Sequence, residues 1–299
     1  MIEIAIGIFV TLGVLFAARW GIWQGFRVNR VIEVGSPQNY GEAFTEVSIP
    51  AVGGKRLFGW LMSAIPGAPL VVVMHGWGAN AESMLPLAVP IRRHGYSVLL
   101  IDARSHGRSD QDNFSSMPRF AEDIGSALDW AALLPGVDPY AVAILGHSVG
   151  GAAALLAASG RQDLRAVISL SAFDHPETVM QIYLSRAMVP YRPIGWLICR
   201  YVERIIGYAF DEIAPVSTIS RIGCPVLIGH GADDLMVAPA AARAIFGRAT
   251  SQMAELAILD GVGHDEGGCF ERISLVLTDF LDRAFKAQKA VSCDMLPGP

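Results

Sequence analysis

The chain has 299 residues, 52% of them hydrophobic, and a formal net charge of −5 at pH 7. That length suffices for one large α/β domain or two small ones. The 23 Lys and Arg residues are dispersed rather than gathered in a block, which argues against a nucleic-acid partner. The four cysteines form no CxxC pair and no HExxH motif occurs, so we expect free thiols and no metal.

An uncharged apolar run, Ile4 to Ala18, opens the chain, and Trp20 and Trp23 follow it. As a helix this run reaches about 22 Å, and its apolar neighbours extend it toward the hydrocarbon core of about 30 Å. Arginines follow the run, so the positive-inside rule places the remaining chain in the cytoplasm. We predict a single-pass membrane helix within residues 1–24. The alternative is a helix packed on the domain or lying on a membrane surface.

After a linker over residues 25–42, strand-like and helix-like runs alternate. Residues 43–50 and 56–64, joined by Gly53-Gly54, predict a β-hairpin. The strands that follow are continuously apolar, which is typical of a parallel sheet buried on both faces. Strands are predicted at 69–74, 97–101, 141–145, 166–170, 225–229 and 256–259, and helices at 81–94, 120–134, 151–158 and 271–285. The alternation predicts a doubly wound, mostly parallel α/β sheet with its site at the carboxyl ends of the strands.

Residues 171–224 form a long insert between two predicted strands. The insert contains an apolar helical run over 194–210, whereas a bare crossover between parallel strands needs far fewer residues. We therefore predict a small helical cap here, within a sheet domain over residues 43–285. A mobile tail is expected over residues 286–299.

The stretch AVAILGHSVGGAAALLAA, residues 141–158, is an apolar strand that breaks at Gly-His-Ser-Val-Gly and resumes as small residues suited to a helix. A G-x-S-x-G sequence in this setting is a nucleophile elbow, in which a tight turn lifts the serine hydroxyl above the sheet edge. The flanking glycines relieve crowding of the backbone. Ser148 is the predicted nucleophile.

The chain resembles the α/β-hydrolase superfamily over about residues 40–285, in its serine esterase, lipase or aminopeptidase-like branches. Five motifs in a fixed order carry the resemblance: HGWGAN at 75–80, DARSHGRS at 102–109, GHSVGG at 146–151, HGADDLMV at 230–237 and GVGH at 261–264. It implies the α/β-hydrolase fold and the chain order Ser, then Asp or Glu, then His.

A serine hydroxyl is a weak nucleophile, so an imidazole must accept its proton. Of the seven histidines, only His264 lies after the last predicted strand in a glycine-flanked loop, and it is the predicted base. We expect His75 and His230 to orient backbone, His106 to be a structural hydrogen-bonding residue, and the side chain of His147 to leave the elbow in another direction.

The acid has two adjacent candidates. Aligned on the family pattern H-G-x-x-D-x-x-V, Asp234 occupies the acid position, and Asp233 is expected to be a loop carboxylate. Asp260 and Asp265 are weaker candidates. The acid holds the imidazole tautomer and stabilises the imidazolium.

Two backbone N–H groups must converge on the oxygen where negative charge develops. By resemblance these belong to Trp77 and Val149. The hypothesis from the sequence is a membrane-anchored serine hydrolase that cleaves a carboxylic ester through an acyl-enzyme on Ser148, without a cofactor. Its substrate is expected to be a small-molecule or lipid ester with an apolar acyl group. Thioester hydrolysis, aminopeptidase-like amide hydrolysis and a non-catalytic binding protein of the same fold remain open.

Overall fold

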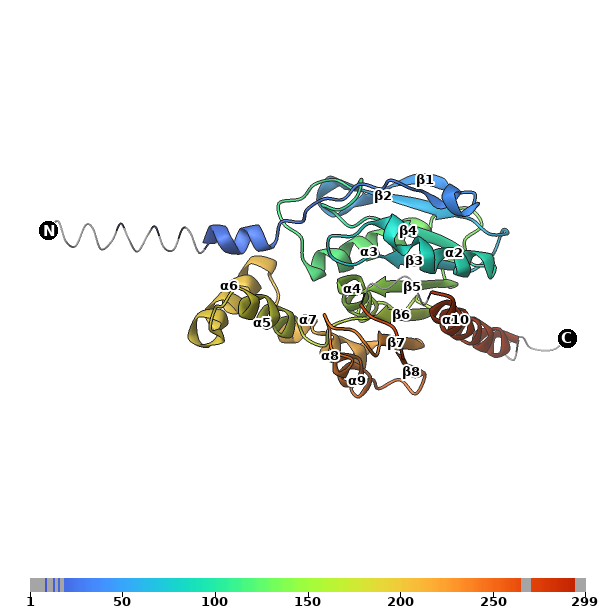
Figure 1. The fold of residues 1–299 in the computed structure, drawn as a ribbon. Coiled ribbons are helices and arrows are strands. Elements are labelled where there is room, and N and C mark those ends of the chain that lie inside the picture. The colour runs from blue at the N-terminus through green and yellow to red at the C-terminus, as the bar shows by residue number, and fades with distance from the viewer. Residues whose placement is uncertain (1–8, 10–12, 14–15, 17–18, 265–269, 294–299) are drawn as a thin grey trace.

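The computed structural model describes residues 19–264 and 270–293, together with positions 9, 13 and 16. These residues build an eight-stranded sheet with helices on both faces (Figure 1). The strand order is β1-β2-β4-β3-β5-β6-β7-β8. The two N-terminal strands are antiparallel, β2 is antiparallel to β4, and the remaining pairs are parallel. The predicted doubly wound, mostly parallel sheet of the α/β-hydrolase fold is confirmed.

The strands lie close to their predicted positions, and the hairpin is confirmed. Their bounds are β1 Thr45–Ala51, β2 Lys55–Met62, β3 Leu70–Met74, β4 Ser97–Ile101, β5 Val142–His147, β6 Ala166–Leu170, β7 Val226–Gly231 and β8 Ala254–Leu259. Every side chain of β3, β4 and β6 is buried. Continuous burial explains why these strands are predominantly apolar rather than alternating, with Ser97 and Ser169 as their polar residues.

The helices differ more from the prediction at their ends. Their bounds are α2 Leu85–Arg93, α3 Met117–Ala131, α4 Val149–Ala158, α5 Pro176–Arg186, α6 Trp196–Ile206, α7 Phe210–Ile213, α8 Pro215–Thr218, α9 Ala240–Phe246 and α10 Phe270–Cys293. Short 3₁₀ turns lie at Pro37–Tyr40, Val52–Gly54, Ala81–Met84 and Ile219–Arg221, and a π turn lies at Tyr191–Gly195. The predicted helix over 81–94 begins late, as its prolines require, because Pro86 occupies the first turn of α2.

Two buried clusters cover the two faces of the sheet. One contains α3, α4 and part of the region between β6 and β7, with Phe120 and Leu155 among its members. The other contains α2 and α10, with Trp60 and Phe280 fully buried. Both clusters anchor the strands, so the loops at the carboxyl ends of β3, β5, β7 and β8 stand on a rigid base.

In the chain, α5 to α8 come between β6 and β7, and in space α5 and α6 extend beyond the sheet (Figure 1). Their position is that of the predicted cap over residues 171–224, and we retain the cap as a proposal. The last helix, α10, continues to Cys293, past the predicted end at Phe285.

The predicted localisation, a single-pass membrane protein with a cytoplasmic catalytic domain, is wrong. No helix within 19–264 or 270–293 combines the length and the apolar character that crossing a bilayer requires. Most of the predicted span over residues 1–24 lies outside the described residues. The described turn of helix from residue 19 to 25 packs against the body: Ile22 contacts the core, and the Trp23 ring meets Phe114 edge-on at 5.7 Å.

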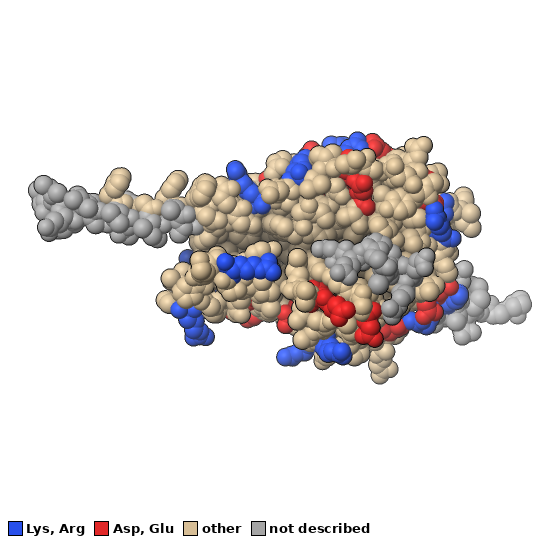
Figure 2. Space-filling view, in the orientation of Figure 1, with Lys and Arg blue, Asp and Glu red and all other residues tan. Residues whose placement is uncertain are grey.

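Positive and negative side chains are interspersed on the molecular face in Figure 2. Tan surface separates them, and no broad field of one sign is visible on this face. An interspersed surface does not generate the strong field that steers highly charged ligands.

Candidate active site

Ser148 occupies the turn between β5 and α4. Its backbone angles, φ 55° and ψ −120°, lie in a region that a non-glycine residue rarely adopts. A Cβ on Gly150 would collide with the carbonyl oxygen of His75, and a Cβ on Gly146 would collide with the main chain of Gly150. The strained turn therefore needs glycine on both sides of the serine, as a nucleophile elbow does.

The structure brings Ser148, His264 and Asp234 into one chain of hydrogen bonds. His264 Nε2 lies 3.0 Å from Ser148 Oγ, and His264 Nδ1 lies 2.6 Å from Asp234 Oδ2. Both distances lie within the range expected of a nucleophile, a base and the group that orients the base. The three residues come from the ends of β5, β8 and β7, which meet at one edge of the sheet.

Asp234 is buried, and four donors surround its carboxylate. Oδ1 accepts from the N–H groups of Met236 and Val237 at 2.9 and 2.8 Å, while Oδ2 faces His264 and, at 3.1 Å, His230 Nε2. Burial by itself raises the pKa of Asp234, but the backbone donors and the His264 ring outweigh it and lower the pKa below its ordinary value. The carboxylate therefore stays ionised beside the imidazole.

The other acid candidates occupy different positions. Asp233 is exposed, and its main-chain N–H donates to the carbonyl of Val262 at 3.0 Å, which leaves its side chain on the outside of the loop. Asp265 lies outside the described residues. Of the two aspartates of the HGADD motif, Asp234 is the one whose carboxylate meets the His264 ring.

The two predicted oxyanion donors flank the serine. Val149 is the first residue of α4, and Trp77 follows β3 in the loop that lies against the elbow: a Cβ on Gly76 would be 3.3 Å from Ser148 Cβ. Within the described ranges, neither the Trp77 N–H nor the Val149 N–H has a hydrogen-bond acceptor. Both donors are available to an oxygen bound next to Ser148, and their role remains a proposal.

Three buried histidines hold loops around the site. His75 Nε2 accepts from the Ala103 N–H at 3.0 Å, and burial lowers its pKa to about 4, so the ring is neutral. His106 Nδ1 lies 3.0 Å from the carbonyl of Arg104, and its pKa is lowered to about 3, again mainly by burial. His230 Nε2 lies 2.9 Å from the carbonyl of Val237. These contacts match the backbone-orienting roles expected from the sequence.

His147 makes a contact that was not predicted. Its Nε2 lies 2.9 Å from the carbonyl oxygen of His264, and the two rings are 5.3 Å apart. Sequence reasoning missed this contact. The available signal was the position of His147 next to the nucleophile, but its direction depends on the fold.

Glu33 belongs to the segment 31–35, which we call the strap, and its carboxyl group is buried beside that of Asp102. The strap is held by Asn80, whose Nδ2 donates to the carbonyl of Val31 at 3.1 Å, and by Glu82, which accepts from the N–H groups of Val34 and Gly35. Both Glu33 side-chain oxygens are buried against Asp102. Burial, followed by the neighbouring Asp102 carboxyl group, raises the pKa of Glu33 to about 8. The sequence offered no signal for this pair.

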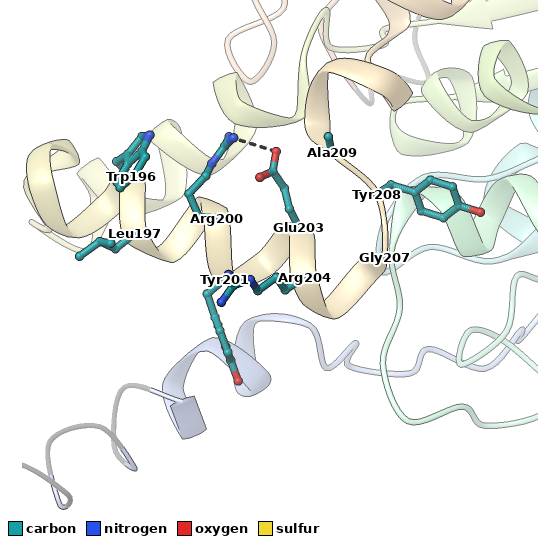
Figure 3. Close-up of a pocket in the computed structure, with 9 residues that line it drawn as sticks. All are labelled: Trp196, Leu197, Arg200, Tyr201, Glu203, Arg204, Gly207, Tyr208 and Ala209. Atoms are coloured by element: carbon teal, nitrogen blue, oxygen red, sulfur yellow. Dashed lines mark ion pairs between the residues drawn. The ribbon is translucent and has the colours of Figure 1, made fainter.

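A groove of about 700 Å³ runs beside α6 (Figure 3). Trp196, Tyr201 and the ion pair between Arg200 and Glu203 line it, and the Tyr201 hydroxyl also accepts from Arg19 of the N-terminal helix at 2.6 Å. Neither Ser148, Asp234 nor His264 lines this groove, so it is separate from the candidate site.

The sheet topology and the ordered motifs at its edge define the chain as a protein of the α/β-hydrolase fold. A sequence model of the family described as "Serine aminopeptidase, S33" matches residues 67–204. Among solved structures, the esterase Pf2001 of Pyrococcus furiosus aligns with a TM-score of 0.72 at 20% identity, covering 87% of this chain and 97% of the esterase.

Two curated relatives show how sequence similarity is distributed. The thiohydrolase aneE of Aspergillus aculeatus is 33% identical over 140 residues, which is 44% of this chain and 42% of the relative. An uncharacterized protein of Mycobacterium tuberculosis is 27% identical over 224 residues, covering 74% of this chain and 72% of the relative. The match to the thiohydrolase thus spans less than half of that protein.

Proposed function

We propose that the protein is a serine hydrolase that cleaves a carboxylic ester through an acyl-enzyme on Ser148. The observation that carries the proposal is the alignment of Ser148 Oγ, the His264 ring and Asp234 at 3.0 and 2.6 Å. This arrangement supplies a nucleophile, a base and an orienting carboxylate. The named esterase of the same fold and the matching S33 family support a hydrolase.

In the proposed reaction, Ser148 Oγ attacks the ester carbonyl carbon while His264 Nε2 takes the hydroxyl proton. Asp234 remains ionised and stabilises the imidazolium that forms. The N–H groups of Trp77 and Val149 donate to the oxyanion of the tetrahedral intermediate. The intermediate collapses, the C–O bond breaks, and His264 returns the proton to the leaving alcohol. A water molecule then attacks the acyl-enzyme with His264 as its base.

The acyl group is proposed to be apolar and the substrate a small-molecule or lipid ester. Large apolar side chains of the proposed cap support this assignment, because Tyr183, Met188 and Leu197 are more than half exposed. Exposed apolar surface of this kind is a common mark of ligand- or partner-binding regions.

Thioester hydrolysis is the second candidate. The same nucleophile, base and oxyanion donors serve it, and the similarity to a protein named thiohydrolase favours it. Aminopeptidase-like amide hydrolysis is the third, from the family description. A non-catalytic binding protein would have no need of a strained serine at hydrogen-bond distance from a histidine.

A fluorophosphonate probe with intact-protein mass spectrometry tests the nucleophile. We expect wild type to gain one probe adduct and Ser148→Ala to gain none. Ser171→Ala is the matched control, because Ser171 also has a positive φ (51°) and follows the neighbouring strand β6, yet it should label like wild type. Equal labelling of Ser148→Ala and wild type would reject the proposal.

A substrate series then separates the three candidates. p-Nitrophenyl esters of graded chain length, acyl thioesters and aminoacyl amides are compared by kcat/KM. The proposal expects the esters to be the best substrates, with kcat/KM rising as the acyl chain lengthens. Preference for thioesters or aminoacyl amides would instead assign the corresponding alternative.

A further inference from the structure

His147 ends β5 and directly precedes the nucleophile. Its Nε2 lies 2.9 Å from the main-chain carbonyl oxygen of His264. A carbonyl oxygen only accepts hydrogen bonds, so Nε2 carries a proton and donates it. The His147 side chain thus donates a hydrogen bond to the main chain of the proposed base, His264.

Two hydrogen bonds within the described residues tie main-chain carbonyls of the loop that carries His264 to neighbouring strands. The carbonyl of Val262 accepts from the Asp233 N–H at 3.0 Å, which ties the loop to the end of β7. The carbonyl of His264 accepts from His147, which ties it to the end of β5. The first anchor faces the acid and the second faces the nucleophile, so the base is fixed between the two strands that supply its partners.

A hydrogen bond to the His264 main chain restrains the loop independently of the contacts of the imidazole ring. Proton transfer requires Ser148 Oγ and His264 Nε2 to stay within hydrogen-bond reach, and a displacement of about 1 Å can reduce a rate about a hundredfold. An anchor on the His264 main chain limits that displacement. Because His147 and Ser148 are consecutive, the anchor sets the position of the base relative to the nucleophile itself.

The opposite side of the His147 ring lies against the loop of the other proposed oxyanion donor. A Cβ on Gly76, the residue before Trp77, would be 3.3 Å from His147 Nδ1. One imidazole therefore packs between the base loop and the loop after β3. A bulky replacement without a donor at position 147 leaves this packing in place while it removes the bond to His264.

We propose that His147 is a positioning residue, whose Nε2–H holds the His264 main chain so that the His264 ring stays at hydrogen-bond distance from Ser148. This inference rests on the proposed hydrolase function. His147 itself exchanges no proton with the substrate.

The test compares His147→Gln with His147→Met. Both side chains have a length similar to histidine, but only glutamine keeps an N–H donor near the position of Nε2. We expect His147→Met to lower kcat for a p-nitrophenyl ester about tenfold with KM within about twofold, the loss typical of one uncharged hydrogen bond. His147→Gln should stay within about threefold of wild type. Equal losses in the two variants, or no loss in His147→Met, would overturn the proposal.

A second measurement is independent of activity. In ¹⁵N-histidine-labelled protein, the His264 ring signals should be sharp in wild type and in His147→Gln, and shifted or broadened in His147→Met at equal thermal stability. Unchanged His264 signals in His147→Met would refute the anchor. If Ser148→Ala still cleaves the ester while these signals respond as expected, the hydrolase mechanism fails and the structural role of His147 stands.

Discussion

Two buried carboxylates in this molecule each accept hydrogen bonds from two main-chain N–H groups, yet their pKa values shift in opposite directions. Asp234 Oδ1 accepts from two backbone N–H groups. Asp102 also accepts from two, those of Ala81 at 2.7 Å and Arg108 at 2.8 Å. The pKa of Asp234 is nevertheless lowered, whereas burial raises that of Asp102. At Asp102 burial outweighs every donor, whereas at Asp234 the backbone donors and the His264 ring together outweigh burial.

Asp234 faces imidazoles, and Asp102 faces a second carboxyl group, that of Glu33. An imidazole favours the ionised carboxylate, while a second carboxyl in a buried site keeps one proton between the two. Glu33 holds that proton, because its pKa is raised to about 8. A buried carboxylate therefore stays an ionised orienting group only where its donors outweigh the cost of burial, as at Asp234, and at the Glu33–Asp102 pair burial leaves one proton on Glu33.

The largest effect on activity is expected at Asp234, the ionised carboxylate. Asp234→Asn should lower kcat about 10⁴-fold, because an amide neither stabilises the imidazolium nor enforces the tautomer that leaves Nε2 free to accept the serine proton. Steady-state kinetics on a p-nitrophenyl ester measure it. Asp233→Asn is the matched control and should stay within about twofold of wild type, since Asp233 is exposed. The reverse order would transfer the acid role to Asp233.

The next effect is steric and concerns the Glu33–Asp102 pair. A Cβ on Gly107 would collide with both Asp102 and Glu33, so Gly107→Ala should lower the free energy of unfolding by about 3 kcal/mol. Gly54→Ala isolates the backbone contribution, because Gly54 also has a positive φ (71°) but no atom within 4 Å of its Cβ position. It should cost about 1 kcal/mol. Urea unfolding measures both, and equal losses would mean that the carboxyl pair is not tightly packed.

The pH dependence of stability distinguishes the two sites by sign. The pKa of Glu33 is raised on folding, so its stabilising contribution is complete below about pH 4.5 and is lost as the pH rises through about 8. The slope is at most about 1.4 kcal/mol per pH unit, and solvent screening reduces it. The pKa of Asp234 is lowered, so its contribution is present above its unfolded pKa of about 3.8 and is lost only as the pH falls below that.

Urea unfolding across this pH range, with wild type and Glu33→Gln side by side, checks the assignment. Glutamine keeps a donor to Asp102 but cannot ionise, so stability should fall with rising pH in wild type and remain flatter in the variant. Parallel curves would show that Glu33 does not titrate in this window.

The smallest effect is expected at the exposed ion pair beside the Glu33–Asp102 pair. Arg108 contacts Glu46 at 2.5 and 3.0 Å, and both side chains are about half exposed. Glu46→Gln should therefore change the free energy of unfolding by less than about 1 kcal/mol, and by less still at high salt. A loss as large as that of Gly107→Ala would mean that the ion pair, rather than the protonated carboxyl, holds the region together.

Part of this structure could be predicted from local patterns. The continuously apolar runs located β3, β4 and β6, because strands buried on both faces admit no polar alternation. Boundaries were harder. Helix α3 begins at Met117 rather than at the predicted residue 120, and Pro118 in its first turn was the overlooked signal. The predicted membrane-spanning helix was not confirmed, since no helix within 19–264 or 270–293 is long and apolar enough to cross a bilayer.

The amino-acid sequence by itself determined the strained serine turn and the order of Ser148, Asp234 and His264, since glycine spacing and motif order are local properties of the chain. Only the tertiary structure decided which neighbours face which. It turned His147 toward the base and placed Glu33 against Asp102, because residues from distant segments meet only when the sheet packs. The acidity of each buried carboxylate depends on that meeting, and so it could not be predicted from the residue or from its neighbours in the chain.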